Sequence, residues 1–264
     1  MQKFETRQEI SSLSDTCKKL CFPAPVIKKT IDSTSTYLRV LAADGAAHGT
    51  VVIAERQSAG RGRTGKSFLS PEGGLYMSVL VKRDLSPDIL EIITPTAAVV
   101  TAMAVKEVFD VDVSVKWVND LFSDGKKVCG ILTEVVRAPS DAQVCYVILG
   151  IGVNVFEPSA GFGELSSIAA SLLSQNTDSG QIFKLASAIV EKLFTLLKVC
   201  NREYIYSEYR KRLFILGRNI LVLRGENTVA AKVIDLERDF SLTVSYEDGK
   251  QEKLTSGEIS IIPM

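Results

Sequence analysis

The chain has 264 residues, a formal net charge of zero and a sequence pI near 6.6. Hydrophobic residues make up 46% and charged residues 23%, which excludes a chain that is disordered throughout and gives no whole-chain signal for nucleic acid or a membrane surface. The longest apolar stretches, about 97–105 and 146–156, are too short to span a bilayer, and the first ten residues lack an apolar signal core, so we expect a cytoplasmic protein.

The first third of the chain predicts alternating strands and helices. Residues 1–26 are mainly polar and predict a poorly ordered lead-in, followed by a strand at 26–31. Ser33 or Thr34 then caps a helix that runs to about residue 43. β-branched residues predict a strand at 50–55, and a further strand is predicted at 75–81, beyond a long glycine-rich loop.

The middle of the chain predicts a long helix and three strands. The helix at 86–109 begins with Ser86 as its cap and a proline in its first turn. Strands follow at 112–118, 128–136 and 145–155, and the last is expected to be buried on both faces because its apolar run is continuous. An Asp-Gly pair at 124–125 predicts a turn between the first two strands.

The last third changes character. We expect a long loop with a short helix at 166–173, an amphipathic helix at 181–199 and a second helix that ends near residue 213. Four short strands with tight turns then predict a small β barrel of about fifty residues.

Cysteine and histidine usage narrows the chemistry. The five cysteines form no C-x-x-C pair, which predicts free thiols and neither a disulfide framework nor a zinc site. His48 is the sole histidine and lies in a polar loop, where we expect it to be solvated. Sites that need several histidines are excluded.

The stretch 58–68, SAGRGRTGKSF, poses the question of function. Residues 60–67 fit the phosphate-loop pattern G-x-x-x-x-G-K-[ST], and the same glycines fit the dinucleotide pattern G-x-G-x-x-G. Both patterns need a helix directly after the loop, because its N-terminal amides hold the phosphates. Pro71 and the two glycines after it prevent such a helix, so we interpret both matches as accidental.

Two readings of this loop remain open from its composition alone. Its glycines and its basic residues Arg61, Arg63 and Lys66 suit a solvated, flexible loop with too few apolar anchors to hold one conformation. They suit equally a loop that orders around an anion, with backbone amides and guanidinium groups facing the anionic oxygens.

The motifs around the loop resemble those of the biotin protein ligases. DSTSTYL, GRGRTG, KWVNDL, KKVCGILTE and GIGVNV follow one another with the spacing of that family, and the likeness runs from about Ile27 to the terminal SGEISII. It implies an α+β fold: a catalytic domain at 27–214 with a mixed sheet similar to class II tRNA synthetases, then an SH3-like barrel at 215–264. The lead-in 1–26 is too short for the DNA-binding domain of some members, so we expect the monofunctional type and no DNA partner.

The resemblance also implies a two-step reaction. Biotin and ATP, with Mg2+, would form biotinyl-5′-AMP and pyrophosphate, and a lysine of a biotin carboxyl carrier protein, such as the acetyl-CoA carboxylase subunit, would then take the biotin. The loop would be mobile when empty and close over the adenylate. No membrane partner is expected, and both a monomer and a homodimer remain open.

Individual positions match the residues that carry this chemistry in the family. Arg61 and Lys127 would act at the biotin carboxylate, and Asp120 would orient or deprotonate the carrier lysine and help to place magnesium, with no metal site of the protein's own. The positions matched to ligand binding are Ser33, Thr34, Ser35, Gln57, Gly60, Arg61, Gly62, Arg63, Phe68, Lys116, Asn119, Lys127, Gly130 and Asn154. Without the resemblance, the residues alone indicate only a helix cap at Ser33 or Thr34, a turn at 119–120 and a strand-end hydrogen bond at Asn154.

The chain departs from the family pattern at four positions. Ser35 stands for an asparagine, Thr64 for a basic residue, Phe68 for a tryptophan and Val118 for a proline. The charges at Arg61, Arg63 and Lys127 remain, so we expect an active enzyme. The alternatives are a lipoate or octanoate transferase of the same superfamily, a non-enzymatic biotin-sensing regulator, and a phosphate-loop ATPase.

Overall fold

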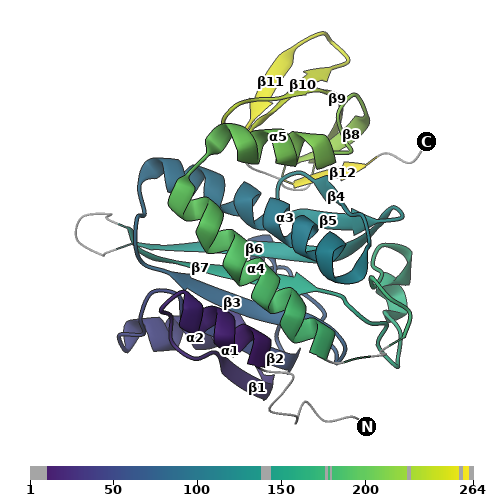
Figure 1. The fold of residues 1–264 in the computed structure, drawn as a ribbon. Coiled ribbons are helices and arrows are strands. Elements are labelled where there is room, and N and C mark those ends of the chain that lie inside the picture. Colours follow the sequence, from purple (N-terminus) through teal and green to yellow (C-terminus); the bar gives the residue numbers. More distant parts are fainter. Residues whose placement is uncertain are drawn as a thin grey trace.

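The strands of the protein form two sheets, joined by helices. The structure, a computed structural model, describes residues 11–137, 144–175, 178, 180–224, 227–255 and 258–261. Within these residues one sheet has seven strands and the other has five, which confirms the predicted α+β class (Figure 1).

The larger sheet is mixed, in the order β1-β2-β3-β7-β6-β5-β4. β1 and β2 run parallel, while the other described neighbours run antiparallel. Its strands are β1 (Val26–Ile31), β2 (Val51–Gln57), β3 (Leu75–Val81), β4 (Ser114–Lys116), β5 (Asp120–Ser123), β6 (Lys126–Arg137) and β7 (Val144–Val153).

Helices cover both faces of this sheet, because its central strands alternate between two apolar clusters. On β2, Val51 and Ile53 face the larger core, while Val52 between them joins a separate cluster beneath Leu38. The helices on the larger core are α1 (Ser11–Lys19), α3 (Pro87–Phe109) and α4 (Gly180–Val199), and the helix on the opposite face is α2 (Thr34–Ala43).

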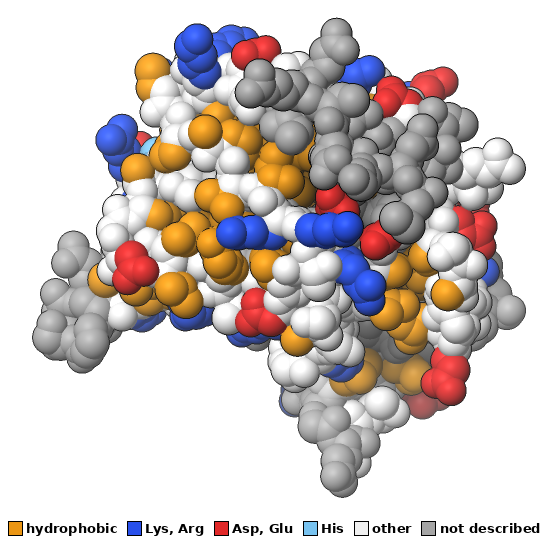
Figure 2. Space-filling view, turned by 90° about the horizontal axis from the view of Figure 1, so that it is seen from below, with side chains coloured by type: hydrophobic (Ala, Val, Ile, Leu, Met, Phe, Trp, Pro, Cys, Tyr) orange, Lys and Arg blue, Asp and Glu red, His pale blue; other side chains and the backbone are white. Residues whose placement is uncertain are grey.

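The surface near α2 mixes apolar and basic side chains. Figure 2 views the molecule from the side of α1, α2 and β1 and shows hydrophobic side chains gathered over the middle of this face with Lys and Arg among them. Val40 of α2 is 57% exposed. Some hydrophobic side chains therefore lie on the surface, outside the two buried clusters.

The smaller sheet follows helix α5 (Arg202–Arg212) and is antiparallel throughout the described strands. Its order is β11-β10-β9-β8-β12. The strands are β8 (Asn219–Arg224), β9 (Asn227–Leu236), β10 (Leu242–Tyr246), β11 (Gln251–Leu254) and β12 (Glu258–Ile261).

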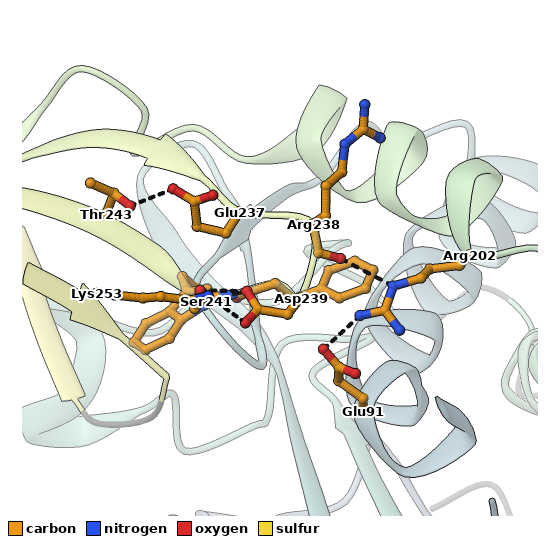
Figure 3. Close-up of polar contacts among 10 residues, drawn as sticks. Glu91, Arg202, Glu237, Arg238, Asp239, Ser241, Thr243 and Lys253 are labelled. Atoms are coloured by element: carbon orange, nitrogen blue, oxygen red, sulfur yellow. Dashed lines mark hydrogen bonds and ion pairs between the residues drawn. The ribbon is translucent and has the colours of Figure 1, made fainter. Parts of the chain in front are cut away.

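The turn between β9 and β10 joins this sheet to the rest of the protein. Phe240 is 4% exposed and packs edge-on against two tyrosines of α5, and its carbonyl accepts a hydrogen bond from Trp117 Nε1 at 2.7 Å. Beside it, Arg202 pairs with Glu91 of α3 at 2.6 Å and donates to the Arg238 carbonyl at 3.2 Å (Figure 3). The smaller sheet is thus anchored to both α3 and the strand end at Trp117.

Several local expectations were wrong. The lead-in contains helix α1 at Ser11–Lys19, whereas residues 1–10 lie outside the described part. Residues 166–173 form no α-helix, and a 3₁₀ turn at Gly163–Ser167 precedes an extended segment. β5 and β11 were not predicted, and the strand expected at 112–118 ends at Lys116.

Two further expectations about burial also change. By length and composition α3 could cross a membrane, whereas the sequence analysis judged the apolar stretches of the chain too short to do so. However, 72% of the apolar 18-residue stretch of α3 is buried inside the protein. His48 is half-buried between Phe22 and Phe194 and its Nδ1 accepts from Lys82 N at 3.1 Å, so it is not simply solvated. The described cysteines are free, as predicted.

Candidate active site

A cavity of about 290 Å³ opens where β2, β4 and β7 end and β3, β5 and β6 begin. The glycine-rich loop lies over it, and the smaller sheet contributes Leu223 to its wall. Gly60 and Asn154, both predicted as binding residues, are not among its lining residues. The predicted residues that do line it are Ser33, Thr34, Ser35, Gln57, Arg61, Gly62, Arg63, Phe68, Lys116, Asn119, Asp120, Lys127 and Gly130.

One end of the cavity is a network of neutral polar groups. Ser33 is the N-cap of α2, as the residues alone indicate, and it also lines the cavity. Its role in ligand binding stays a prediction. Gln57 Oε1 accepts from Thr34 N at 2.7 Å, and Gln57 Nε2 donates to Ser70 Oγ at 2.8 Å. Ser78 Oγ lies 2.8 Å from Thr34 Oγ1 and 3.0 Å from Ser35 Oγ. Hydroxyls and amides that both donate and accept are thereby held in fixed positions.

The middle of the cavity is walled by glycine backbone. Gly130 of β6 and Gly152 of β7 are paired in register, and the ring of Phe68 covers them. A Cβ atom would lie 3.0 Å from this ring at Gly130 and 2.7 Å at Gly152, which is too close without movement. The missing side chains therefore give an aromatic ring access to the strand backbone.

The other end of the cavity is basic. Lys127 Nζ lies 2.7 Å from Asp120 Oδ1 and 5.8 Å from the centre of the Phe68 ring. Arg63 Nη1 donates to Asn119 Oδ1 at 2.9 Å. Asp120 is the single carboxylate among the described lining residues of the whole cavity, which include five Lys or Arg side chains, so the cavity favours anions.

The loop over the cavity forms a small hairpin in this structure. Gly62 N donates to the Lys66 carbonyl at 2.7 Å and Phe68 N donates to the Gly60 carbonyl at 2.9 Å. Thr64 turns the chain with φ of 51°, which Gly65 continues with φ of 77°. Gly60 is structural, because a Cβ atom there would lie 2.3 Å from the Phe68 carbonyl oxygen. Arg61 and residues 64–67 remain exposed, so the hairpin is a solvated loop with a hydrogen-bonded shape, and its mobility stays a prediction.

Asn154 has a role outside the cavity wall. It is 6% exposed, and its Nδ2 donates to the Ala170 carbonyl at 3.0 Å. Its backbone N–H donates to the Val128 carbonyl at 2.8 Å, so it fastens the extended segment near 170 beside β6. The strand-end hydrogen bond read from the residues alone describes this position.

Other lining residues were not predicted. Gly150 and Gly152 lie in the quoted GIGVNV motif, and their alternation on a buried strand was the available signal, because a glycine there marks close approach. Tyr76 lines the cavity and donates to the Pro71 carbonyl at 2.7 Å, and burial raises the pKa of its hydroxyl, which stays neutral. Trp117 also lines the cavity. Nothing in the sequence around Leu223 indicates that it lines the cavity.

Comparisons with known proteins agree with one another. A family model described as the biotin/lipoate A/B protein ligase family matches residues 26–154. The bifunctional ligase/repressor BirA of Bacillus spizizenii is 38% identical over 245 residues, which cover 89% of this chain and 73% of that protein. The biotin–[acetyl-CoA-carboxylase] ligase of Mycobacterium tuberculosis is 27% identical over 86% of this chain and 85% of its own length.

A solved structure gives the same likeness. The biotin protein ligase from Aquifex aeolicus in complex with biotin and ATP is similar with a TM-score of 0.74 and 27% identity. The match covers 91% of this chain and 99% of that chain, so it includes both sheets.

Proposed function

The chain belongs to the biotin/lipoate A/B protein ligase family, among its biotin protein ligases, and we propose that it joins biotin to a carrier-domain lysine through biotinyl-5′-AMP. The observation that carries the proposal is the order of three environments along one cavity. A neutral polar network, a glycine wall under an aromatic ring and a basic end follow one another. Biotin has a polar ureido head, an apolar ring and tail, and a carboxylate in the same order.

The polar network suits the ureido head. A urea offers two N–H donors and a carbonyl acceptor, and the hydroxyls of Ser33 and Thr34 and the amide of Gln57 can complement both. The network is held by its own hydrogen bonds, which lowers the entropy lost when a ligand binds. A dithiolane ring, as in lipoate, has no N–H or carbonyl group and would gain none of the further hydrogen bonds that these groups can make to a urea.

The basic end suits the first step of the reaction. The biotin carboxylate must approach the α-phosphorus of ATP, and fixed cations lower the repulsion between the two anions. Arg63 and Lys127 would hold the carboxylate and phosphate oxygens as the new oxygen–phosphorus bond forms and pyrophosphate leaves. Arg61, which pairs with Glu134 farther along β6, would add positive charge from another part of the cavity wall. Lys116 lies in the same wall and adds a further cation.

Magnesium enters this proposal with the nucleotide, as MgATP. No group of three or more metal-ligating side chains occurs in the described part of the chain, and Asp120 is the carboxylate that reaches the cavity. Mg2+ is often held by one or two carboxylates together with substrate phosphates, and this site fits that mode through Asp120. When bound, the ion would supply charge neutralisation at the phosphates.

Asp120 would also serve the second step. The carrier lysine must lose a proton before its amine attacks the biotinyl carbonyl and releases AMP. Asp120 lies at the cavity wall beside Lys127, where it can orient that amine or accept its proton. The hairpin that lies over the cavity would keep water from the mixed anhydride.

Transfer to a carrier tests the whole function. The purified protein, biotin and MgATP are incubated with a biotin carboxyl carrier domain, and attached biotin is detected by mass spectrometry. A carrier whose acceptor lysine is replaced by arginine is the control. Biotin on the first carrier alone supports the proposal, while lipoate attachment in a parallel reaction without biotin attachment would move the chain to the lipoate branch.

A further inference from the structure

One acidic residue of the KKVCGILTE motif has no part in the chemistry above. Glu134 lies on β6 opposite Ile148, on the α2 face of the sheet, and its side chain is only 12% exposed. A carboxylate so little exposed needs partners that offset its lost hydration.

Two arginines from different elements supply those partners. Arg39 of α2 places Nη2 2.7 Å from Glu134 Oε1. Arg61 of the loop places Nη2 2.7 Å from the same oxygen and Nη1 3.3 Å from Oε2, a two-pronged contact. Bidentate guanidinium–carboxylate pairs fix geometry as well as adding energy. Glu134 therefore fastens the loop to the sheet through the arginine proposed to act on substrate.

The net charge of Arg39, Arg61 and Glu134 decides whether this cluster attracts substrate anions. Arg61 with Glu134 alone would sum to zero and offer substrate anions little attraction. Arg39 brings the cluster to one net positive charge at the cavity, while it is itself absent from the described cavity wall. Both arginine side chains remain about two-fifths exposed, at 41% and 43%, so Arg61 stays accessible.

We propose that Glu134 is a positioning residue that holds Arg61 and its loop at the cavity before substrate arrives, and that Arg39 supplies the charge that keeps the cluster attractive to anions. Its role in catalysis rests on the proposed function. The fastening of the loop does not, because it concerns the ligand-free protein. It opposes the mobile empty loop that the family resemblance implies, and the trypsin experiment below decides between the two.

Trypsin tests the fastening directly, since the loop carries Arg61, Arg63 and Lys66. We compare the ligand-free cleavage rate within residues 61–66 of wild type, Glu134→Gln and the matched control Glu107→Gln. Glu107 of α3 likewise forms an ion pair, with Lys192 of α4 at 2.6 Å, but away from the loop. We expect cleavage of Glu134→Gln to be about tenfold faster, from the loss of charged hydrogen bonds, and Glu107→Gln to match wild type. Equal rates in all three proteins would overturn the proposal.

Salt provides a second route if Glu134→Gln does not fold. The arginine partners of Glu134 are 41% and 43% exposed, so raising NaCl should screen the pairs in part and modestly accelerate loop cleavage of wild type relative to a peptide substrate of trypsin. No acceleration would count against the proposal.

Arg39→Gln separates charge from fastening. Loop cleavage should stay at the wild-type rate, because Arg61 keeps its partner, while KM for biotin in pyrophosphate exchange rises about tenfold at unchanged kcat. A wild-type KM would refute the charge role. If wild type itself showed no exchange, the proposed function would fail while the trypsin result still judged the fastening.

Discussion

Lys127→Met removes the cation at the centre of the proposed chemistry and nearly preserves side-chain length. Lys127 Nζ lies 2.7 Å from Asp120 Oδ1, with side chains 32% and 20% exposed. Leaving that carboxylate without its partner should cost about 1–2 kcal/mol of folding free energy, because both groups keep some contact with water. At about 2–4 °C per kcal/mol for a chain of this size, Tm falls by only a few degrees.

The loss of activity should be much larger. A preorganised donor aimed at charge that develops in the transition state is worth about 100- to 1000-fold in rate. We therefore expect biotin-dependent pyrophosphate exchange to fall by that factor in Lys127→Met while the protein stays folded. Lys126→Met is the matched control, because the neighbouring Lys126 donates to the Ser166 carbonyl and does not line the cavity. A Lys127→Met enzyme within fivefold of Lys126→Met would refute the electrostatic reasoning.

Three further predictions concern packing and pH. Gly152→Ala places a Cβ atom 2.7 Å from the Phe68 ring, so KM for biotin should rise by about tenfold or more with little change in Tm, and an unchanged KM would show that the ring is not part of the binding site. Phe240→Ala empties a site that is 4% exposed and should cost about 3–5 kcal/mol in urea unfolding; an unchanged midpoint would contradict the anchoring of the smaller sheet. Burial, with Arg83 nearby, lowers the pKa of His48 below 6.5, so the unfolded chain binds the proton more readily. The free energy of unfolding should therefore decrease as the pH is lowered below about 6.5. Tm of His48→Phe, measured across the same range, should lack this component, and identical pH profiles would argue against it.

The parts of the fold predicted from sequence are those with strong local patterns. The amphipathic helix α4 and the continuous apolar strand β7 were predicted because their periodicity reflects burial directly. Helix α1 was missed because it has nine residues and few apolar ones, and it depends on Leu13 and Cys17 packing at its contact with α4.

The false helix at 166–173 shows the opposite failure. Its alanine and leucine content favours a helix, but tertiary hydrogen bonds prevail. Lys127 N donates to the Ile168 carbonyl and Ala170 N donates to the Lys127 carbonyl, so the segment runs beside β6. Such pairing between distant residues leaves no mark in a local window.

The residues of the candidate site likewise fall into those that a local motif predicts and those that only the tertiary structure brings together. Arg61, Lys127 and Gly130 sit in local motifs whose order along the chain carried the family resemblance. Glu134 and Leu223 reach the site region only through pairing of strands and docking of the smaller sheet, so their residue types alone gave no signal. Gly60 shows a motif position that serves the shape of the loop and not the cavity wall.

The most direct measurement is ATP–pyrophosphate exchange by the purified wild-type protein with biotin, with lipoate and with neither acid. The account predicts exchange with biotin alone, because the neutral network of Thr34 and Gln57 complements a urea and the basic end activates its carboxylate. Exchange with lipoate but not biotin, or none with either acid from folded protein, would contradict it.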